Sequence, residues 1–380
     1  MILTPLLLSV ALLAVANGAN DNFKGVATLY GSATTSYRQA LIWATAATVA
    51  GSSVSVVLAS SLARSFSGKG LVPDEFLTVE MLAAVACSGA VTILVATRLG
   101  MPTSTTHALT GALVGAGLAG AGAGGVGWET LATKFAQPLL LSPVLAIGLT
   151  AVLYVILRAT RRSLGVRRES CLCVGQESAA PAGLPLSGAV ASVAAGPPMG
   201  VGLSVALEHS SECAARYGGR VLGVRAQTAV DAVHYLSAGA VCFARAVNDT
   251  PKIAALLLAS AALGARLSAL SLAFVALAMA VGGWLFSRRV AETMSKHITE
   301  LNPGQGLTAN LITAALVFGA SRLGVPVSTT HVSCGAIFGI GLVNGRREWR
   351  TIARIFAAWV TTLPLGLVLG VAFFQLFQTL

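Results

Sequence analysis

Charged side chains are scarce in this chain of 380 residues, because Asp, Glu, Lys and Arg make up only 10% of it. A soluble domain carries about 25%, so this composition excludes an ordinary soluble protein. The uncharged stretches between the charges reach the roughly 20 residues that a helix needs to cross a bilayer. Examples are residues 39–63, 135–157, 267–287 and 355–380. We therefore predict an all-α, multi-pass protein of the cell membrane.

Acidic residues are few as well, since 14 Asp and Glu stand against 25 Lys and Arg, a net charge of +11. In a soluble protein this excess would indicate nucleic acid as a partner. Here arginines follow apolar segments directly, as at Arg158, Arg161 and Arg162 and at Arg288 and Arg289. The positive-inside rule places such clusters on the cytoplasmic face. No basic surface interleaved with aromatic residues accompanies them, so we expect no nucleic-acid partner.

The first twenty residues contain no Lys or Arg, the residues that form the basic start of a signal peptide. They are apolar and lead directly into a polar motif, Gly18-Ala19-Asn20-Asp21. We therefore expect them to form a retained first helix.

One segment of the sequence occurs twice. Residues 98–118 read RLGMPTSTTHALTGALVGAGL, and residues 322–342 read RLGVPVSTTHVSCGAIFGIGL. More than half of the positions are identical at a constant offset of 224, among them the run Ser-Thr-Thr-His. Self-similarity of this kind is the sequence signature of a duplicated structural unit.

A second, weaker pair lies upstream of the first. ANGANDNFKGVA at residues 16–27 and ARAVNDTPKIAA at residues 244–255 share an Asn, an Asp and a Lys. The order and the spacing of the motifs are similar in both halves, so we predict two homologous membrane repeats, residues 1–158 and 226–380. Residues 159–225 between them are rich in Pro, Ala, Gly and Ser, which predicts an extramembrane linker.

The repeated ionisable residues are candidates for function, because burying charge in a bilayer is expensive. They are Asp21 and Lys24 in the first copy and Asp249 and Lys252 in the second. On a helix, side chains three positions apart share a face and can pair. The alternative is a bridge that only locks helices, which an apolar pair could do without the cost of desolvation.

The repeated Pro-x-Ser-Thr-Thr-His motif predicts a helix start inside the membrane. Pro102 and Pro326 restrain the entry, and Ser and Thr are preferred at helix N-termini, where backbone NH groups lack partners. Such an end binds anions well, and two of them could close on a tetrahedral oxyanion from opposite sides. Hydrogen bonding within membrane helices would explain single hydroxyls, but not the same run twice beside a proline.

His107 and His331 follow the hydroxyl run and raise the alternative of a Ser-His hydrolase. Such an enzyme needs one asymmetric constellation with an oxyanion hole and a water-accessible cleft, whereas this motif is duplicated within apolar segments. We expect no enzyme. We interpret both histidines as structural, with a proton-linked role as the alternative.

Three of the six cysteines, Cys171, Cys173 and Cys213, fall in the linker, and His209 precedes the last of them by four residues. Three sulfurs and an imidazole would suit tetrahedral zinc. Cys-x-Cys is a tighter spacing than the usual zinc-finger pair, and the stretch between the ligands is long. A structural zinc is therefore one hypothesis for the linker, a linker without metal is the other, and no further cofactor is expected.

Together these motifs resemble the inorganic phosphate transporter family, the Pit or PHO4 type of cation-coupled phosphate permease. The resemblance is carried by Gly18-Ala19-Asn20-Asp21, by Asn248-Asp249 and by Pro-x-Ser-Thr-Thr-His in both halves, and it covers both repeats but not the linker. It implies two repeats of inverted topology, with broken or re-entrant helices and a substrate near the bilayer midplane.

The resemblance also implies roles for individual residues, with hydroxyl-bearing helix ends and the charged pairs around phosphate and the Asn-Asp segments near the coupling ion. The substrate-binding residues would be Asp21, Lys24, Ser104, Thr105, Thr106, Asp249, Lys252, Ser328, Thr329 and Thr330. The coupling-ion residues would be Asn20, Asp21, Asn248 and Asp249.

This chain departs from the family at Lys24 and Lys252, where members typically have Asn. An ammonium can take the place of a bound sodium ion or neutralise the anion directly. We therefore expect symport of inorganic phosphate with a cation, with H+ favoured over Na+.

Two alternatives stay open. One is a permease for sulfate or another oxyanion, because two added lysines suit a divalent anion. The retained Asp21 and Asp249 favour phosphate, which still carries a proton that it can donate to a carboxylate. The other alternative is a membrane sensor or hydrolase, although internal duplication fits alternating access better. The sequence leaves the oligomeric state open, with a homodimer as one candidate.

Overall fold

The computed structural model describes residues 3–167, 170–176, 203–209, 222–259 and 268–379. The chain forms two compact units. One joins Met1–Val155 with His234–Leu380, and we call it the helical unit; the other is Ile156–Val233, the linker unit.

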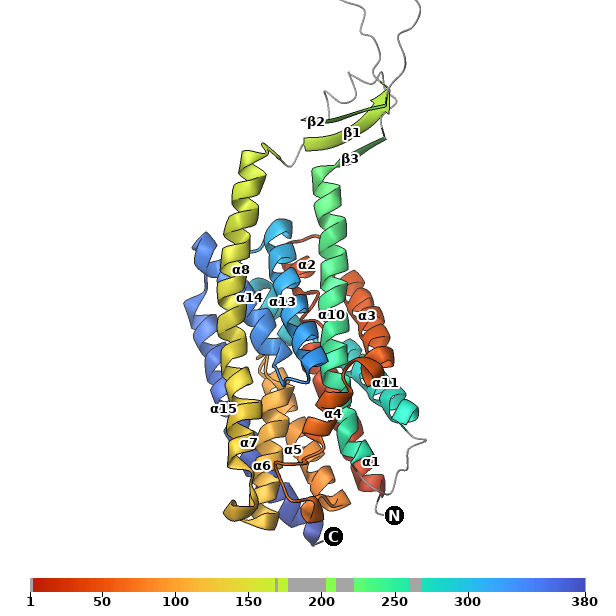
Figure 1. Ribbon diagram of the computed structural model, residues 1–380, viewed down its shortest axis with the longest axis vertical. Coiled ribbons are helices and arrows are strands. Elements are labelled where there is room, and N and C mark those ends of the chain that lie inside the picture. Colours follow the sequence, from red (N-terminus) through yellow and green to blue (C-terminus); the bar gives the residue numbers. More distant parts are fainter. Residues whose placement is uncertain (1–2, 168–169, 177–202, 210–221, 260–267, 380) are drawn as a thin grey trace, which may run out of the picture. The chain divides into compact units, whose positions relative to one another are not determined.

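The helical unit is built from helices that run through both halves of the sequence (Figure 1). The first half contains α1 (Leu3–Asp21), α2 (Ala27–Gly31), α3 (Tyr37–Leu58), α4 (Ser60–Phe66), α5 (Val79–Arg98), α6 (Thr105–Ala121), α7 (Trp128–Thr130) and α8 (Gln137–Ser163). Three short turns of other helix types are η1 (Asp74–Phe76), η2 (Ala123–Gly125) and η3 (Leu131–Ala136). The second half contains α10 (Ala226–Leu258), α11 (Ser268–Phe286), α12 (Arg288–Lys296), α13 (Pro303–Leu323), α14 (Thr329–Asn344) and α15 (Trp349–Gln378).

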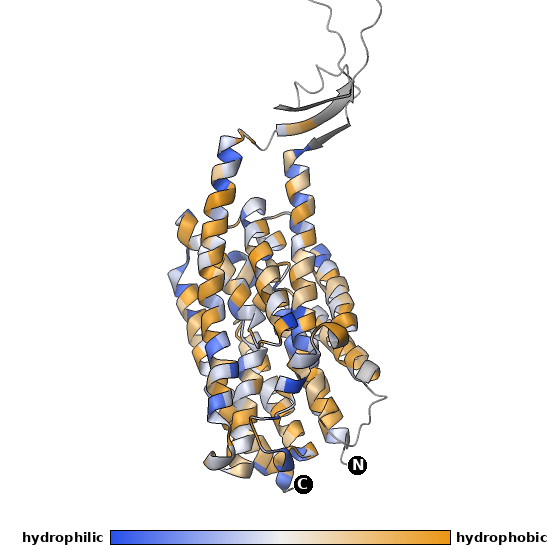
Figure 2. Cartoon of the chain, in the orientation of Figure 1, coloured by the Kyte–Doolittle hydropathy of each residue, from blue (hydrophilic) through white to orange (hydrophobic). Residues whose placement is uncertain are grey.

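Four helices of the described residues are long and apolar enough to cross a membrane, or up to six if each bent pair of helices is one span. The four are Val79–Arg98, Trp128–Ser163, Pro303–Leu323 and Trp349–Gln378, and the pairs bend by 84° after α3 and by 72° after α11. The apolar stretches predicted from the sequence fall on these helices, and Figure 2 shows apolar colouring along most of α8 and α11. The predicted all-α membrane fold is therefore confirmed for the helical unit.

Both Ser-Thr-Thr-His motifs begin helices, as predicted. The Oγ of Ser104 accepts a hydrogen bond from the backbone N of His107 at 3.1 Å, and Ser328 caps α14 through the backbone N of His331 at 3.2 Å. In each case the serine satisfies one of the backbone NH groups that a helix start leaves without an intrahelical partner.

The first motif helix, α6, packs against α15 from the other half of the chain through glycines. A Cβ on Gly111 would lie 2.2 Å from the carbonyl oxygen of Leu363, and one on Gly115 would lie 2.1 Å from that of Leu367. Such distances leave no room for a side chain. The two backbones therefore approach as closely as small residues allow.

The second motif helix, α14, makes the corresponding contact with α8 from the first half. A Cβ on Gly335 would lie 3.0 Å from the carbonyl oxygen of Pro143, and one on Gly339 would lie 2.5 Å from that of Ile147. Each half of the helical unit thus supplies the long helix on which the other half's motif helix packs. This reciprocity is consistent with the predicted duplication, while the inverted orientation of the repeats stays a prediction.

The apolar core of the helical unit consists mainly of two clusters. One is drawn largely from α1, α5 and α6 with the end of α10, and the other from α2, α3, α12, α14 and α15. The charged residues of the repeated motifs belong to neither cluster. They are buried all the same, so the helical unit contains a polar centre as well as an apolar core.

The linker unit contains a small antiparallel sheet that the sequence did not predict. Its strands are β1 (Ser170–Gln176), β2 (Leu203–His209) and β3 (Leu222–Arg225), in the order β2-β1-β3. Cys171 lies opposite Glu208 and Cys173 opposite Ala206, while His209 lies opposite Ser170. Cys213 is outside the described residues, and among those described no group of three or more His, Cys, Asp or Glu could hold a metal ion. The zinc hypothesis stays a prediction.

The glycine contacts yield a test of this packing. Gly115→Ala and Gly339→Ala should each lower the free energy of unfolding by about 1–3 kcal/mol, because an added methyl would overpack a backbone contact. Gly319→Ala on α13 is the control, since its Cβ would meet nothing within 4 Å. Thermal unfolding of the detergent-purified variants measures the difference, and equal stability of all three would contradict close helix packing at Gly115 and Gly339.

Candidate functional site

The residues singled out by the repeated motifs come together in the helical unit. They lie at the end of α1, in the turn that follows it, in the C-terminal third of α10 and at the starts of α6 and α14. All ten predicted substrate-binding residues are at most 4% exposed, and Asn20 and Asn248 are fully buried. Thr329, in the first turn of α14, is the most exposed of the ten at 4%. The structure therefore gathers the predicted site residues into one buried polar cluster.

The expected Asp-Lys pairs form in both copies, but on different backbones. α1 ends at Asp21, and Lys24 sits in the turn that follows, where its backbone N bonds to the carbonyl oxygen of Asp21 at 3.1 Å. α10 instead continues through Pro251, so that Asp249 and Lys252 share one helical face and lie 3.5 Å apart. Lys24 pairs with Asp21 Oδ1 although the segment is not helical at this point.

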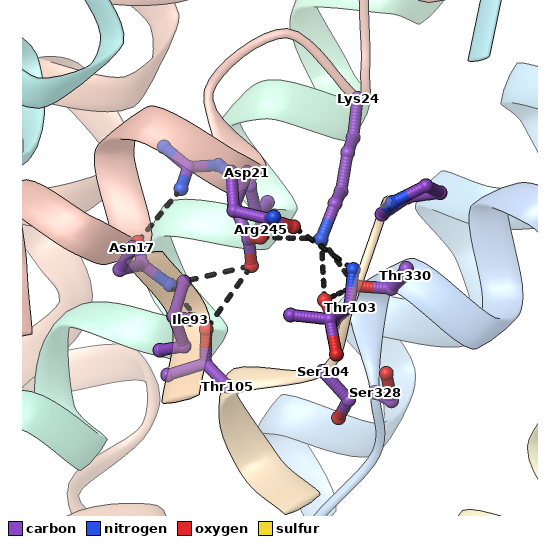
Figure 3. A network of polar contacts seen from close by, with 12 residues as sticks. Asn17, Asp21, Lys24, Ile93, Thr103, Ser104, Thr105, Arg245, Ser328 and Thr330 are labelled. Atoms are coloured by element: carbon purple, nitrogen blue, oxygen red, sulfur yellow. Dashed lines mark hydrogen bonds and ion pairs between the residues drawn. The ribbon is translucent and has the colours of Figure 1, made fainter. Parts of the chain in front are cut away.

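Lys24 connects the end of α1 to both motif segments. Figure 3 shows its side chain pointing between Thr103 and Thr330, with Ser104 and Ser328 close by. Its Nζ donates to the carbonyl oxygen of Thr103 at 3.0 Å and also contacts Thr330 Oγ1. The ammonium is thus held by a carboxylate, a carbonyl and a hydroxyl oxygen.

Lys252 makes the corresponding contacts in the second half. Its Nζ donates to the carbonyl oxygen of Val327 at 3.1 Å and to Thr106 Oγ1 at 2.8 Å. Val327 is the counterpart of Thr103 at the repeat offset of 224, and Thr330 is the counterpart of Thr106. Each lysine therefore takes a carbonyl from its own half and a threonine hydroxyl from the other.

Asn20 and Asn248 brace the segments that precede the motif helices. Asn20 donates to Thr97 Oγ1 at 2.9 Å and accepts from the backbone N of Thr103 at 3.0 Å. Asn248 accepts from Ser321 Oγ, the counterpart of Thr97, at 3.2 Å and donates to the carbonyl oxygen of Val327 at 3.4 Å. These amides hold in place the non-helical backbone whose carbonyls bind the lysines.

The two histidines bring the motif helices together. The ring centroids of His107 and His331 lie 4.6 Å apart, and Trp359 packs on His331 at 4.0 Å. His107 Nδ1 also lies 2.9 Å from Ser104 Oγ, and Trp359 Nε1 donates to the carbonyl oxygen of Pro102 at 3.2 Å. These contacts fit the structural role expected from the sequence.

Asn17 belongs to the site, although the sequence analysis did not select it. Its Nδ2 donates to Thr105 Oγ1 at 2.9 Å and lies 3.3 Å from Asp21 Oδ2 and 3.4 Å from Asp249 Oδ2. One amide therefore bridges the two carboxylates of the repeated motifs. Asn17 lies within the repeated segment 16–27, but it is neutral and its counterpart in the second copy is an arginine, so the comparison of the two copies did not select it.

Arg245 is the second residue that the sequence analysis missed. It is 1% exposed, its Nη1 donates to Asn17 Oδ1 at 3.1 Å, and its Nη2 donates to Thr48 Oγ1 at 2.9 Å. The Nη1 atom also lies 3.9 Å from Asp249 Oδ2. The argument from ionisable residues in apolar surroundings, which selected Asp249 and Lys252, applies equally to this arginine.

An apolar helical unit that buries a charged centre between two helix N-termini has the plan of a secondary transporter. The comparisons with known proteins agree with this class. The model of the phosphate transporter family, PHO4, matches residues 17–370, and the chain belongs to that family. The protein is accordingly an integral membrane protein.

Several relatives match nearly the whole chain. The inorganic phosphate transporter 2-1, chloroplastic, of Arabidopsis thaliana is 28% identical over 95% of this chain and 69% of its own length. A putative phosphate permease of Thermococcus kodakarensis is 28% identical over 96% and 95%. A probable low-affinity inorganic phosphate transporter of Mycobacterium tuberculosis is 27% identical over 96% and 76%. These relatives are named transporters and permeases, not enzymes.

A solved structure shares the fold. It is described as the sodium-dependent phosphate transporter, and it superposes with a TM-score of 0.75 at 20% identity, covering 100% of this chain and 99% of its own. At this identity the likeness establishes the architecture and leaves the coupling ion of this chain open.

The reciprocal lysine contacts can be tested by removing the two hydroxyls. Thr106→Val and Thr330→Val should each cost about 1.5–3 kcal/mol of stability, because each deletes a buried hydrogen bond to a charged group. Thr361→Val is the control, since this threonine is exposed and bonds only within α15. Thermal unfolding should show similar losses for the two site variants, and a loss in only one would contradict the equivalence of the two lysines.

Proposed function

We propose that this protein is a secondary transporter that moves inorganic phosphate across the cell membrane. The observation that carries the proposal is the meeting of two helix N-termini, each with a Ser-Thr-Thr run, at a buried centre that contains lysines. Helix N-termini attract anions through their NH groups and the helix dipole, and ammonium groups add positive charge. The relatives named as phosphate transporters and permeases support phosphate as the cargo.

The residues proposed to bind phosphate are the hydroxyl-bearing residues of both motifs together with the two Asp-Lys pairs. Ser104 and Ser328 begin the two helices, and the side chains of Thr106 and Thr330 already bond to lysines. An anion that enters between the helix ends would compete with these threonine oxygens for the lysine N–H donors. The two repeats would then expose the site alternately to the two sides of the membrane, as inverted repeats do in other transporters.

We propose protons rather than sodium as the coupling ion. Carboxylate, carbonyl and hydroxyl oxygens are the ligands that hard cations take in proteins, and here a lysine ammonium occupies such a set in each half. A resident ammonium supplies the charge that sodium would bring. Sodium dependence, as named for the structural relative, is the competing outcome.

Uptake of labelled phosphate into proteoliposomes tests the anion site. Ser104→Ala and Ser328→Ala should each weaken phosphate binding by about 1–3 kcal/mol, as expected for a hydrogen bond to a charged group. Ser53→Ala is the control, because Ser53 is exposed on α3 and bonds only to its own helix. Unchanged affinity in both site variants would remove the motif from the site, and competition by sulfate as strong as by phosphate would identify a broader oxyanion permease.

The coupling ion is tested by restoring the asparagines typical of the family. Uptake by the unmodified protein should not depend on sodium and should respond to a proton gradient. Lys24→Asn with Lys252→Asn should abolish uptake or create a sodium requirement, because the double variant removes both resident ammonium groups. Steep sodium dependence in the unmodified protein would show that the lysines do not replace the ion and are structural partners of Asp21 and Asp249.

A further inference from the structure

Five charged side chains are buried together in the helical unit, and they do not balance. Asp21 and Asp249 are the carboxylates, and Lys24, Arg245 and Lys252 are the cations, each at most 2% exposed. In the part of the chain that the structure describes, no other Asp, Glu, Lys or Arg is buried. With all five groups ionised, the centre carries three positive charges against two negative ones, an excess of one.

The excess arises at one position where the two halves differ. Lys24 pairs with Asp21, whereas Lys252 and Arg245 share Asp249, with nearest N–O distances of 3.5 and 3.9 Å. One carboxylate therefore faces two cations, and Arg245 is the additional one. At the offset of 228 that relates Asp21 to Asp249, the counterpart of Arg245 is Asn17, a neutral amide. The duplicated parts of the site therefore balance, and the arginine alone adds the extra charge.

The guanidinium of Arg245 makes several hydrogen bonds, but one of its nitrogen atoms makes none. Its Nη1 and Nη2 atoms donate to Asn17 Oδ1, Asn22 Oδ1 and Thr48 Oγ1. Its Nε is buried and has no hydrogen-bond partner among the described residues. A buried donor without a partner is rare in proteins and often marks the place of a ligand, an ion or a water.

A buried charge without a counter-charge is costly, and the cost falls at a particular step of transport. An alternating-access transporter has to close its site on both sides before it reopens, and the five charged side chains of this centre are all buried. With all five groups ionised and one monovalent anion bound, the closed centre is neutral. Without the anion it would close around one uncompensated positive charge, which desolvation penalises strongly.

We propose that this transporter works preferentially as an exchanger of monovalent oxyanions, and that Arg245 sets this preference. The proposal rests on phosphate as the cargo, in which case the exchanged species is dihydrogen phosphate. In exchange, the site closes with an anion bound in both directions of the cycle and is neutral each time. In net uptake, one lysine ammonium of the empty site has to release its proton on the side where the anion has left before the site closes, and it takes up a proton again on the uptake side. One proton therefore accompanies each anion, and the return of the empty site limits the rate.

Trans-stimulation in proteoliposomes tests the proposal. The initial uptake of labelled phosphate is measured with and without unlabelled phosphate inside, at equal pH on both sides. For the unmodified protein we expect uptake to be about tenfold faster with internal phosphate, the rate ratio that about 1.4 kcal/mol in the barrier produces. A ratio near one would overturn the proposal, while net phosphate uptake would leave the proposed function standing. Absence of phosphate uptake under both conditions would overturn both.

Variants separate the charge of Arg245 from its shape. Arg245→Gln removes the excess charge, so its ratio should fall towards one, whereas Arg245→Lys keeps the charge and should keep the ratio. Arg288→Gln is the control, because Arg288 is exposed and pairs with Glu292 on the surface. An unchanged ratio in Arg245→Gln would overturn the role of the arginine.

A second variant covers the case in which Arg245→Gln does not reconstitute. Asn22→Asp places a carboxylate where the amide oxygen now lies 3.4 Å from Arg245 Nη2, so it cancels the same excess without removing the arginine. The amide nitrogen of Asn22 donates to Thr45 Oγ1 and not to either carboxylate of the centre. The ratio of this variant should also fall towards one. Protection of each variant by phosphate in thermal unfolding shows that it is folded, and a folded Asn22→Asp variant with the original ratio would overturn the proposal.

Discussion

The structure depends on how it buries two lysine ammonium groups among apolar helices. An ammonium taken out of water needs both a counter-charge and hydrogen-bond acceptors. Lys24 and Lys252 obtain the charge from the aspartate three residues earlier, and they obtain backbone acceptors from Thr103 and Val327. Those carbonyls are available because the chain is not helical just before α6 and α14. The non-helical segments before α6 and α14 therefore supply the acceptors that the buried lysines need, and the lysines in turn satisfy the carbonyl groups of these segments.

The same lysines tie the two halves together. Lys24 reaches Thr330 on α14, and Lys252 reaches Thr106 on α6. α6 and α14 in turn pack through glycines on the long helix of the opposite half. A movement that separates α6 from α14 would therefore break a contact of each lysine at once. A change in the position of α6 relative to α14 would therefore also change the surroundings of both lysine ammonium groups.

The sequence could predict those features that depend on residues close together in the chain, and it could not predict contacts between distant residues. The starts of α6 and α14 and the Asp-Lys pairs follow from caps and short spacings, so the repeated motifs were enough to predict them. The bridge by Asn17 joins residues 88 and 232 positions apart, and nothing in one sequence indicates such a distance. The strands of the linker unit are short segments without strong alternation. Arg245 differs from these cases, because its charge in an apolar stretch was visible and only its lack of a matching residue in the first half concealed it.

That lack of a match explains how a duplicated site can have a net charge. Duplication of an Asp-Lys pair gives two neutral pairs. Only a position that differs between the two copies can therefore change the net charge of the site. Arg245 sits at such a position. It donates hydrogen bonds to the neutral Asn17, Asn22 and Thr48, and it shares Asp249 with Lys252. Its charge therefore adds to the centre, while Lys24 and Lys252 keep their contacts with the aspartates and with the threonines of the opposite half. Under the proposed function, the repeated motifs would determine where an anion binds, and the single arginine would determine how much negative charge the closed site requires.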